Sequence, residues 1–216
     1  MPQIFEPSDV LIIKLVLLVP LILILLGVVN LFRYATSPVA ADVAVEQPIP
    51  FSHKHHVGDD GIDCRYCHTS VEEGPTAGMP STSTCLTCHA QLFRDAPALA
   101  PLHDSLRDET PIRWKRVHQL PDFVYFDHSI HINKGVSCQH CHGRVDQMPA
   151  IMRQQKLDMQ WCLQCHENAA SHVGPPDQVF AMHDREPLSK AEQKQLVEHL
   201  QLQSTERLTS CSTCHR

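Results

Sequence analysis

The sequence has few of the residues from which an ordinary protein core is built. Aromatic side chains make up only 6% of its 216 residues. It has no Gly-rich phosphate loop, no dinucleotide-binding fingerprint, no Ser/His/Asp triad and no carboxylate cluster, so nothing in it indicates nucleotide chemistry or hydrolysis. An excess of basic residues is missing too: the formal net charge is −6. That charge argues against a nucleic-acid partner.

No cysteine is left over for a free thiol or a disulfide framework. The ten cysteines fall in five C-x-x-C-H motifs: Cys64/Cys67/His68, Cys85/Cys88/His89, Cys138/Cys141/His142, Cys162/Cys165/His166 and Cys211/Cys214/His215. Two thiols three positions apart can bond the two vinyl groups of one porphyrin, and the adjacent histidine can ligate its iron. The alternative is zinc, but five pairs cannot be grouped evenly into four-cysteine sites. The pattern therefore predicts five covalently bound haems c.

This haem content sets the expected fold class. Residues 51–216 provide roughly 33 residues for each haem, which is far too few for a side-chain core around each one. With 8 glycines and 16 prolines, the chain suits short helices and ordered loops wrapped on porphyrin faces. We therefore expect a mostly α and irregular fold in which the haems themselves form the core.

A long apolar run precedes the first motif. Residues 10–32 would span about 35 Å as a helix, enough to cross the hydrocarbon layer of a lipid bilayer, and they exceed the apolar region of a cleaved signal peptide. This predicts a single transmembrane anchor in residues 1–34, followed by a Pro/Ala-rich linker in residues 35–50. Covalent haem attachment takes place outside the bacterial cytoplasm. The haem domain is therefore expected on the periplasmic side of the inner membrane.

An internal duplication organises the haem domain. The element F-x-H-x-x-H occurs at residues 51–56 and 126–131, each time before two C-x-x-C-H motifs. This defines one dihaem module at 51–92, a connector at 93–122 and a second dihaem module at 123–168. The segment 169–216 carries the fifth haem, and Ser189 with Glu192 predicts a capping box for a helix near 190–202.

The duplicated element also suggests the second axial ligands of four irons. Histidines three positions apart lie on one side of a helical turn but reach different irons. We therefore predict four distal ligands: His53, His56, His128 and His131.

The distal ligand of the fifth haem is open at this stage. His118 lies in an apolar and aromatic approach to the second module, which suits a buried ligand. Met159, beside Trp161, offers a thioether. The alternative for Met159 is packing against a porphyrin edge.

The segments FSHKHH, GIDCRYCHTSVE, RVHQLPDFVYFDHSIHINKGVSCQHCHGRVDQMP and LDMQWCLQCHE resemble the membrane-anchored pentahaem cytochrome subunit of alternative complex III. The F-x-H-x-x-H elements are similar to those of the cytochrome c3/c7 superfamily. The resemblance covers residues 51–168, the anchor and the terminal haem motif. It implies an electron-transfer subunit that works with integral-membrane and peripheral subunits of a quinol oxidoreductase complex. It also implies that a monohaem cytochrome c or a haem-copper oxidase accepts the electrons.

Two other functions remain open from the sequence. One is a stand-alone membrane-anchored quinol dehydrogenase that feeds a periplasmic reductase. The other is a multihaem enzyme, which would need one iron with an open coordination position.

Overall fold

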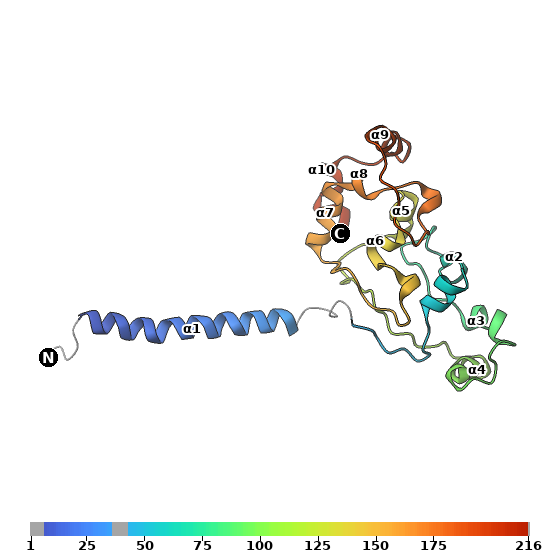
Figure 1. Cartoon of the computed structure of the whole chain (residues 1–216), viewed down its shortest axis with the longest axis horizontal. Coiled ribbons are helices and arrows are strands. Elements are labelled where there is room, and N and C mark those ends of the chain that lie inside the picture. Colours follow the sequence, from blue (N-terminus) through green and yellow to red (C-terminus); the bar gives the residue numbers. More distant parts are fainter. Residues whose placement is uncertain (1–6, 36–42, 216) are drawn as a thin grey trace. The chain divides into compact units, whose positions relative to one another are not determined.

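The computed structural model describes residues 7–35 and 43–215. Residues 1–6 of the predicted anchor and 36–42 of the predicted linker lie outside the described residues. Contacts within the chain divide it into two units, Met1–Ala40 and Ala41–Arg216 (Figure 1). The predicted dihaem modules and the C-terminal segment thus belong to one compact unit.

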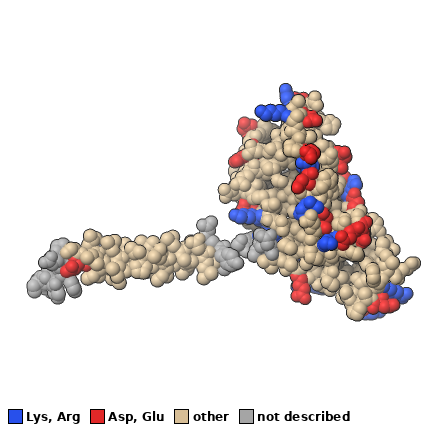
Figure 2. All heavy atoms as spheres, in the orientation of Figure 1, with Lys and Arg blue, Asp and Glu red and all other residues tan. Residues whose placement is uncertain are grey.

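The first unit contains one helix, α1, which spans Pro7–Ala35. Its segment Ser8–Phe32 has a mean hydropathy of 3.1, and none of its most apolar window is buried inside the protein. At 1.5 Å per residue, these 25 residues measure about 37 Å. On the face shown in Figure 2, helix α1 carries charged atoms only near its N-terminal end. The predicted apolar helix is confirmed, and it is long enough to cross a membrane.

The second unit consists of short helices joined by irregular segments (Figure 1). The helices are η1 (a π-helix, Lys54–Asp59), α2 (Cys64–Cys67), α3 (Thr82–His89), η2 (Pro97–Leu99), α4 (Ala100–Arg107), α5 (His128–Asn133), α6 (Cys138–His142), η3 (Val145–Gln147), α7 (Met159–Glu167), α8 (Ala169–His172), η4 (Pro176–Gln178), α9 (Lys190–His199), α10 (Thr205–Leu208) and α11 (Cys211–Cys214). Between residues 43 and 215 the only β pairing is two isolated bridges, Ala44 with Met152 and Val136 with Val173. The expected helical and irregular class is confirmed.

Short helices carry the five C-x-x-C-H motifs, and at three of these helices a polar side chain caps the start. Asp63 accepts a hydrogen bond from the backbone N–H of Arg65 at α2, and Asp158 accepts one from Trp161 at α7. Ser81 accepts one from Thr84 at α3. Such caps satisfy amide groups that have no partner inside the helix, so they place the start of each turn.

The apolar core formed by side chains is small. One cluster joins Val71, Ile132 and Val179, and a second joins Val136, Val173 and Leu200. Two clusters of this size cannot hold a unit of this length together through hydrophobic burial alone. The expectation that the haems complete the core is compatible with this packing and stays a prediction.

The two halves of the duplication contact each other through the backbone. Helix η1 lies against η3, and the N–H of Lys54 donates to the carbonyl of Met148 at 2.9 Å. The approach is so close that a Cβ atom on Gly58 would overlap the carbonyl group of Asp146. A residue without a side chain is therefore required at position 58.

The helix predicted near residues 190–202 begins as expected. Ser189 and Glu192 form the capping box, and both of its hydrogen bonds are present. Helix α9 ends at His199 instead of 202, because Gln201 takes a positive φ of 51° and turns the chain.

Candidate haem sites

The five C-x-x-C-H motifs define five sites, numbered here 1 to 5 in chain order. One helical turn places the two thiols of each motif on the same side of its helix, where both can reach one porphyrin. The histidine of each motif is the next residue after the second cysteine.

Four motif histidines face a second histidine ring. The distances between ring centroids are 6.5 Å for His53–His68, 6.1 Å for His56–His89, 6.3 Å for His128–His142 and 6.1 Å for His131–His166. The rings are almost parallel in the first and third of these pairs, with interplanar angles of 3° and 7°. Every predicted distal histidine thus lies opposite the motif histidine of one particular site.

This spacing fits an iron between the rings. Two metal–imidazole bonds of about 2 Å and two half-rings of roughly 1.1 Å place the ring centres roughly 6 Å apart. Direct stacking of two rings would bring the centres closer, to about 4 Å. The residues present therefore fit haem c with two axial histidines at sites 1 to 4. When bound there, haem c supplies one-electron chemistry at the iron.

Hydrogen bonds orient these rings for ligation. The Nδ1 atom of each of seven histidines lies 2.7–3.1 Å from a backbone carbonyl oxygen: His68 at Gly78, His89 at Leu92, His166 at Leu208, His215 at Phe123, His56 at Ser52, His128 at Pro75 and His131 at Asp127. A carbonyl oxygen only accepts, so Nδ1 carries the proton. The lone pair of Nε2 is left for a metal.

Burial keeps several of these ligands uncharged. It lowers the pKa of His53 to about 4, with further lowering from the neighbouring His68. It also lowers the pKa of His142 to about 3, followed by the effect of His118. A histidine must be neutral to bind a metal, so both rings have the required form at neutral pH.

The two F-x-H-x-x-H elements repeat one geometry. Phe51 lies edge-on to His53 at 4.9 Å and stacks on His56 at 4.4 Å. Phe126 does the same with His128 at 4.7 Å and His131 at 4.5 Å. The phenylalanine thus packs between its two histidines and fixes how far apart they lie. In the sequence, this phenylalanine identifies the repeat but does not indicate that it spaces the two histidines.

Site 5 differs from the other four. The described part of the chain places no histidine ring opposite His215, whose nearest aromatic neighbour is Phe123 at 6.0 Å. Met159 is 63% exposed at the first residue of α7. Its role as a ligand stays a prediction.

His118 lies next to His142 of site 3, and its role as a ligand stays a prediction. Its ring is 4.3 Å from that of His142 and inclined by 78°, so the geometry of the four pairs is not reproduced. Burial, and then the nearby charge of Arg153, lower the pKa of His118 to about 4. The buried Arg153 is a charged neighbour of site 3 that no sequence motif indicated.

The predicted distal ligands can be tested against a neighbour in the sequence. We expect His56→Ala to change the iron of site 2 from low spin to high spin, because the Nε2 atom opposite His89 is lost. His55→Ala is the matched control, since the exposed His55 ring lies 3.6 Å from Asp60 and faces no motif histidine. Magnetic circular dichroism of the purified protein measures the spin state. Equal spectra for the two variants would contradict the assignment of His56.

Comparison with known proteins agrees with this site geometry. No family model matches the chain. The multihaem cytochrome c subunit of the menaquinone reductase of Nitratidesulfovibrio vulgaris is 33% identical to it over 150 residues. The alignment covers 60% of this chain and 71% of that protein. With five C-x-x-C-H motifs, four pairs of facing histidine rings and this relationship, the chain belongs to the family of membrane-associated multihaem cytochromes c represented by that subunit.

Proposed function

We propose that this protein is a five-haem electron-transfer subunit of a membrane-bound quinone oxidoreductase complex. The observation that carries the proposal is the set of four histidine pairs whose rings are 6.1–6.5 Å apart. Two axial histidines close both faces of an iron, so these sites can pass electrons but leave no position for a substrate. At these four sites the chain would therefore act as a relay, and the quinone chemistry would take place in other subunits.

In the membrane, the haems exchange electrons with a quinone. The relative is named for menaquinone reductase, and the resemblance to the pentahaem subunit of alternative complex III also implies quinol. Helix α1 holds the haem unit at the periplasmic surface of the bilayer, while the quinone site belongs to other subunits, because a single helix cannot enclose one. A monohaem cytochrome c or a haem-copper oxidase is the acceptor if the complex oxidises quinol.

Copurification and direct reduction test this proposal together. We expect affinity-tagged protein in mild detergent to bring down polytopic membrane subunits, and its haems to be reduced by quinol only in that complex. The pyridine haemochrome assay should give five haems per chain. Full-length protein that oxidises quinol alone, at the rate seen in membranes, would contradict the complex and favour the stand-alone dehydrogenase.

The direction of electron transfer distinguishes a complex that oxidises quinol from one that reduces menaquinone. We expect quinol to reduce the haems, as in alternative complex III. If reduced haems instead reduce menaquinone and quinol has no effect, the complex works in the direction that the name of the relative implies.

The distal ligand of site 5 gives a further prediction. A thioether favours ferrous iron and raises the reduction potential, so Met159→His should remove the highest-potential component of a redox titration while five haems stay bound. Met159→Leu is the control for packing. If it leaves both the titration and the spin state unchanged, Met159 only packs against the haem, and His118 becomes the candidate to test by the same titration.

A further inference from the structure

The contacts between motifs do not follow the order of the chain. Four junctions link the five sites, and each is built from residues that lie in the two motifs or close to them in the sequence. The argument rests on the five haems of the proposed function but goes beyond it, because it concerns which sites are neighbours.

Site 2 meets site 1. The hydroxyl of Tyr66, within the first motif, lies 2.7 Å from that of Thr87, within the second. These two residues and the start of α3 line a pocket of about 290 Å³.

Site 1 meets site 3, although site 2 lies between them in the sequence. Cys138 of the third motif packs against the cluster of Val71, Ile132 and Val179, and Val71 follows His68 of the first motif by three residues. The side chains of Cys64 and Cys138 also contact each other.

Site 3 meets site 4. His140 lies within the third motif, and its ring nitrogen is within 4.8 Å of the sulfur of Cys165 in the fourth. The ring of His140 is also 5.6 Å from that of Trp161, which precedes Cys162.

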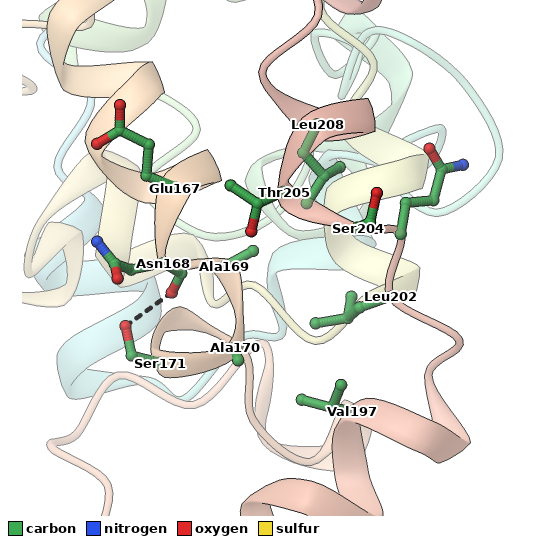
Figure 3. A pocket seen from close by; sticks show the side chains of 11 residues that line it. Glu167, Asn168, Ala169, Ala170, Ser171, Val197, Leu202, Ser204, Thr205 and Leu208 are labelled. Carbon is green, nitrogen blue, oxygen red and sulfur yellow. Dashed lines mark hydrogen bonds between the residues drawn. The ribbon is translucent and has the colours of Figure 1, made fainter.

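Site 4 meets site 5. The ring of His166 donates to the carbonyl of Leu208 at 2.9 Å, and helices α7 and α10 are in contact. A pocket of about 340 Å³ lies between them, with Glu167 and Leu208 in its wall (Figure 3). The hydroxyl of Thr213, within the fifth motif, donates to the carbonyl of Arg207 in α10 at 2.7 Å.

From these junctions we propose that the five haem sites form one unbranched row in the order 2–1–3–4–5, with sites 2 and 5 at its ends. Figure 1 shows α3, α2, α6 and α7 following one another across the unit in this order. Among residues 43–215, no thiol contact of this kind joins the second motif to the third. An independent observation agrees: of the ten cysteines, the two that are exposed are Cys88 of site 2 and Cys211 of site 5. Electrons would thus enter and leave the protein through the second and fifth haems.

The order of the five sites can be tested in the full-length protein, because a neighbouring paramagnetic iron broadens the resonance signal of each ferric haem. A methionine ligand raises the potential of the iron that it binds, so at a suitable potential that one iron is ferrous and diamagnetic while the others remain ferric. In His53→Met, the electron paramagnetic resonance signals of sites 2 and 3 should both narrow, because both lose a paramagnetic neighbour. In the matched variant His56→Met, only the signal of site 1 should narrow. His128→Met identifies the signal of site 3.

Two results would overturn the order. The first is a signal of site 3 that narrows in His56→Met and not in His53→Met, because this would mean that the sites are arranged in sequence order.

The second result comes from electron cryomicroscopy of the unaltered complex, which also serves if a variant loses haem. An iron of site 3 that lies closer to that of site 2 than to that of site 1 refutes the proposal. The haem count is measured first: a count other than five defeats the proposed function, whereas five haems in another order defeat only this inference.

Discussion

Replacing both Cys138 and Cys141 with alanine should prevent the whole haem unit from accumulating. Cys138 packs against the cluster of Val71, Ile132 and Val179, and its backbone N–H donates to the carbonyl of Val179. Site 3 contacts the site on either side of it, so the loss of its haem would leave a large cavity in the middle of a unit with little side-chain core. We expect the level of folded protein to fall roughly tenfold or more. Haem staining and immunoblotting of the same membranes measure it.

The matched control removes the attachment of site 5 with Cys211→Ala and Cys214→Ala. Cys211 is exposed, and α11 lies at the end of the chain, so fewer contacts depend on this haem. We expect four-haem protein to accumulate in the control. Normal levels of folded four-haem protein from the Cys138 and Cys141 variant would contradict the view that the haems form the core.

A chain that begins at Val43, exported by a cleavable signal peptide, should bind five haems and lose its reduction by quinol in membranes. The structural reason is that the haem unit keeps its first contacts, since the bridge between Ala44 and Met152 and the bond from Val45 to Ile151 remain. Helix α1, with mean hydropathy 3.1, supplies the attachment to the bilayer. Absorbance of the reduced haems after addition of quinol measures the effect.

An unrelated transmembrane helix of the same length separates two roles of α1. If the replacement restores reduction by quinol, α1 only tethers the haem unit to the membrane. If it does not, α1 also contacts partner subunits. Full reduction of the shortened chain by membranes would show that neither role is needed, against the prediction.

The local chemistry of this protein could be read from its sequence. The spacing of C-x-x-C-H fixes two thiols and a histidine on one helical turn, so the attachment residues follow from local geometry alone. The apolar helix α1 and the capping box of Ser189 and Glu192 are also determined within a few residues, and both were predicted. The repeat of F-x-H-x-x-H indicated four distal histidines because duplicated segments reuse their geometry.

The pairing of these histidines was decided only by the tertiary structure. The sequence does not say that His53 faces His68 while His56 faces His89, because that depends on where α2 and α3 lie relative to η1. His118 illustrates the same limit. Its apolar surroundings suggested a buried ligand, but packing places it beside His142 and Arg153.

The neighbours of each site were decided in the same way. Cys64 and Cys138 are far apart in the chain, and only the packing of distant segments brings them together. The bonds that attach a haem form within one motif, so their positions follow from spacing along the backbone. The order of the sites depends on packing between segments that are distant in sequence. The sequence thus determined what each site binds, and the tertiary structure decided which sites adjoin.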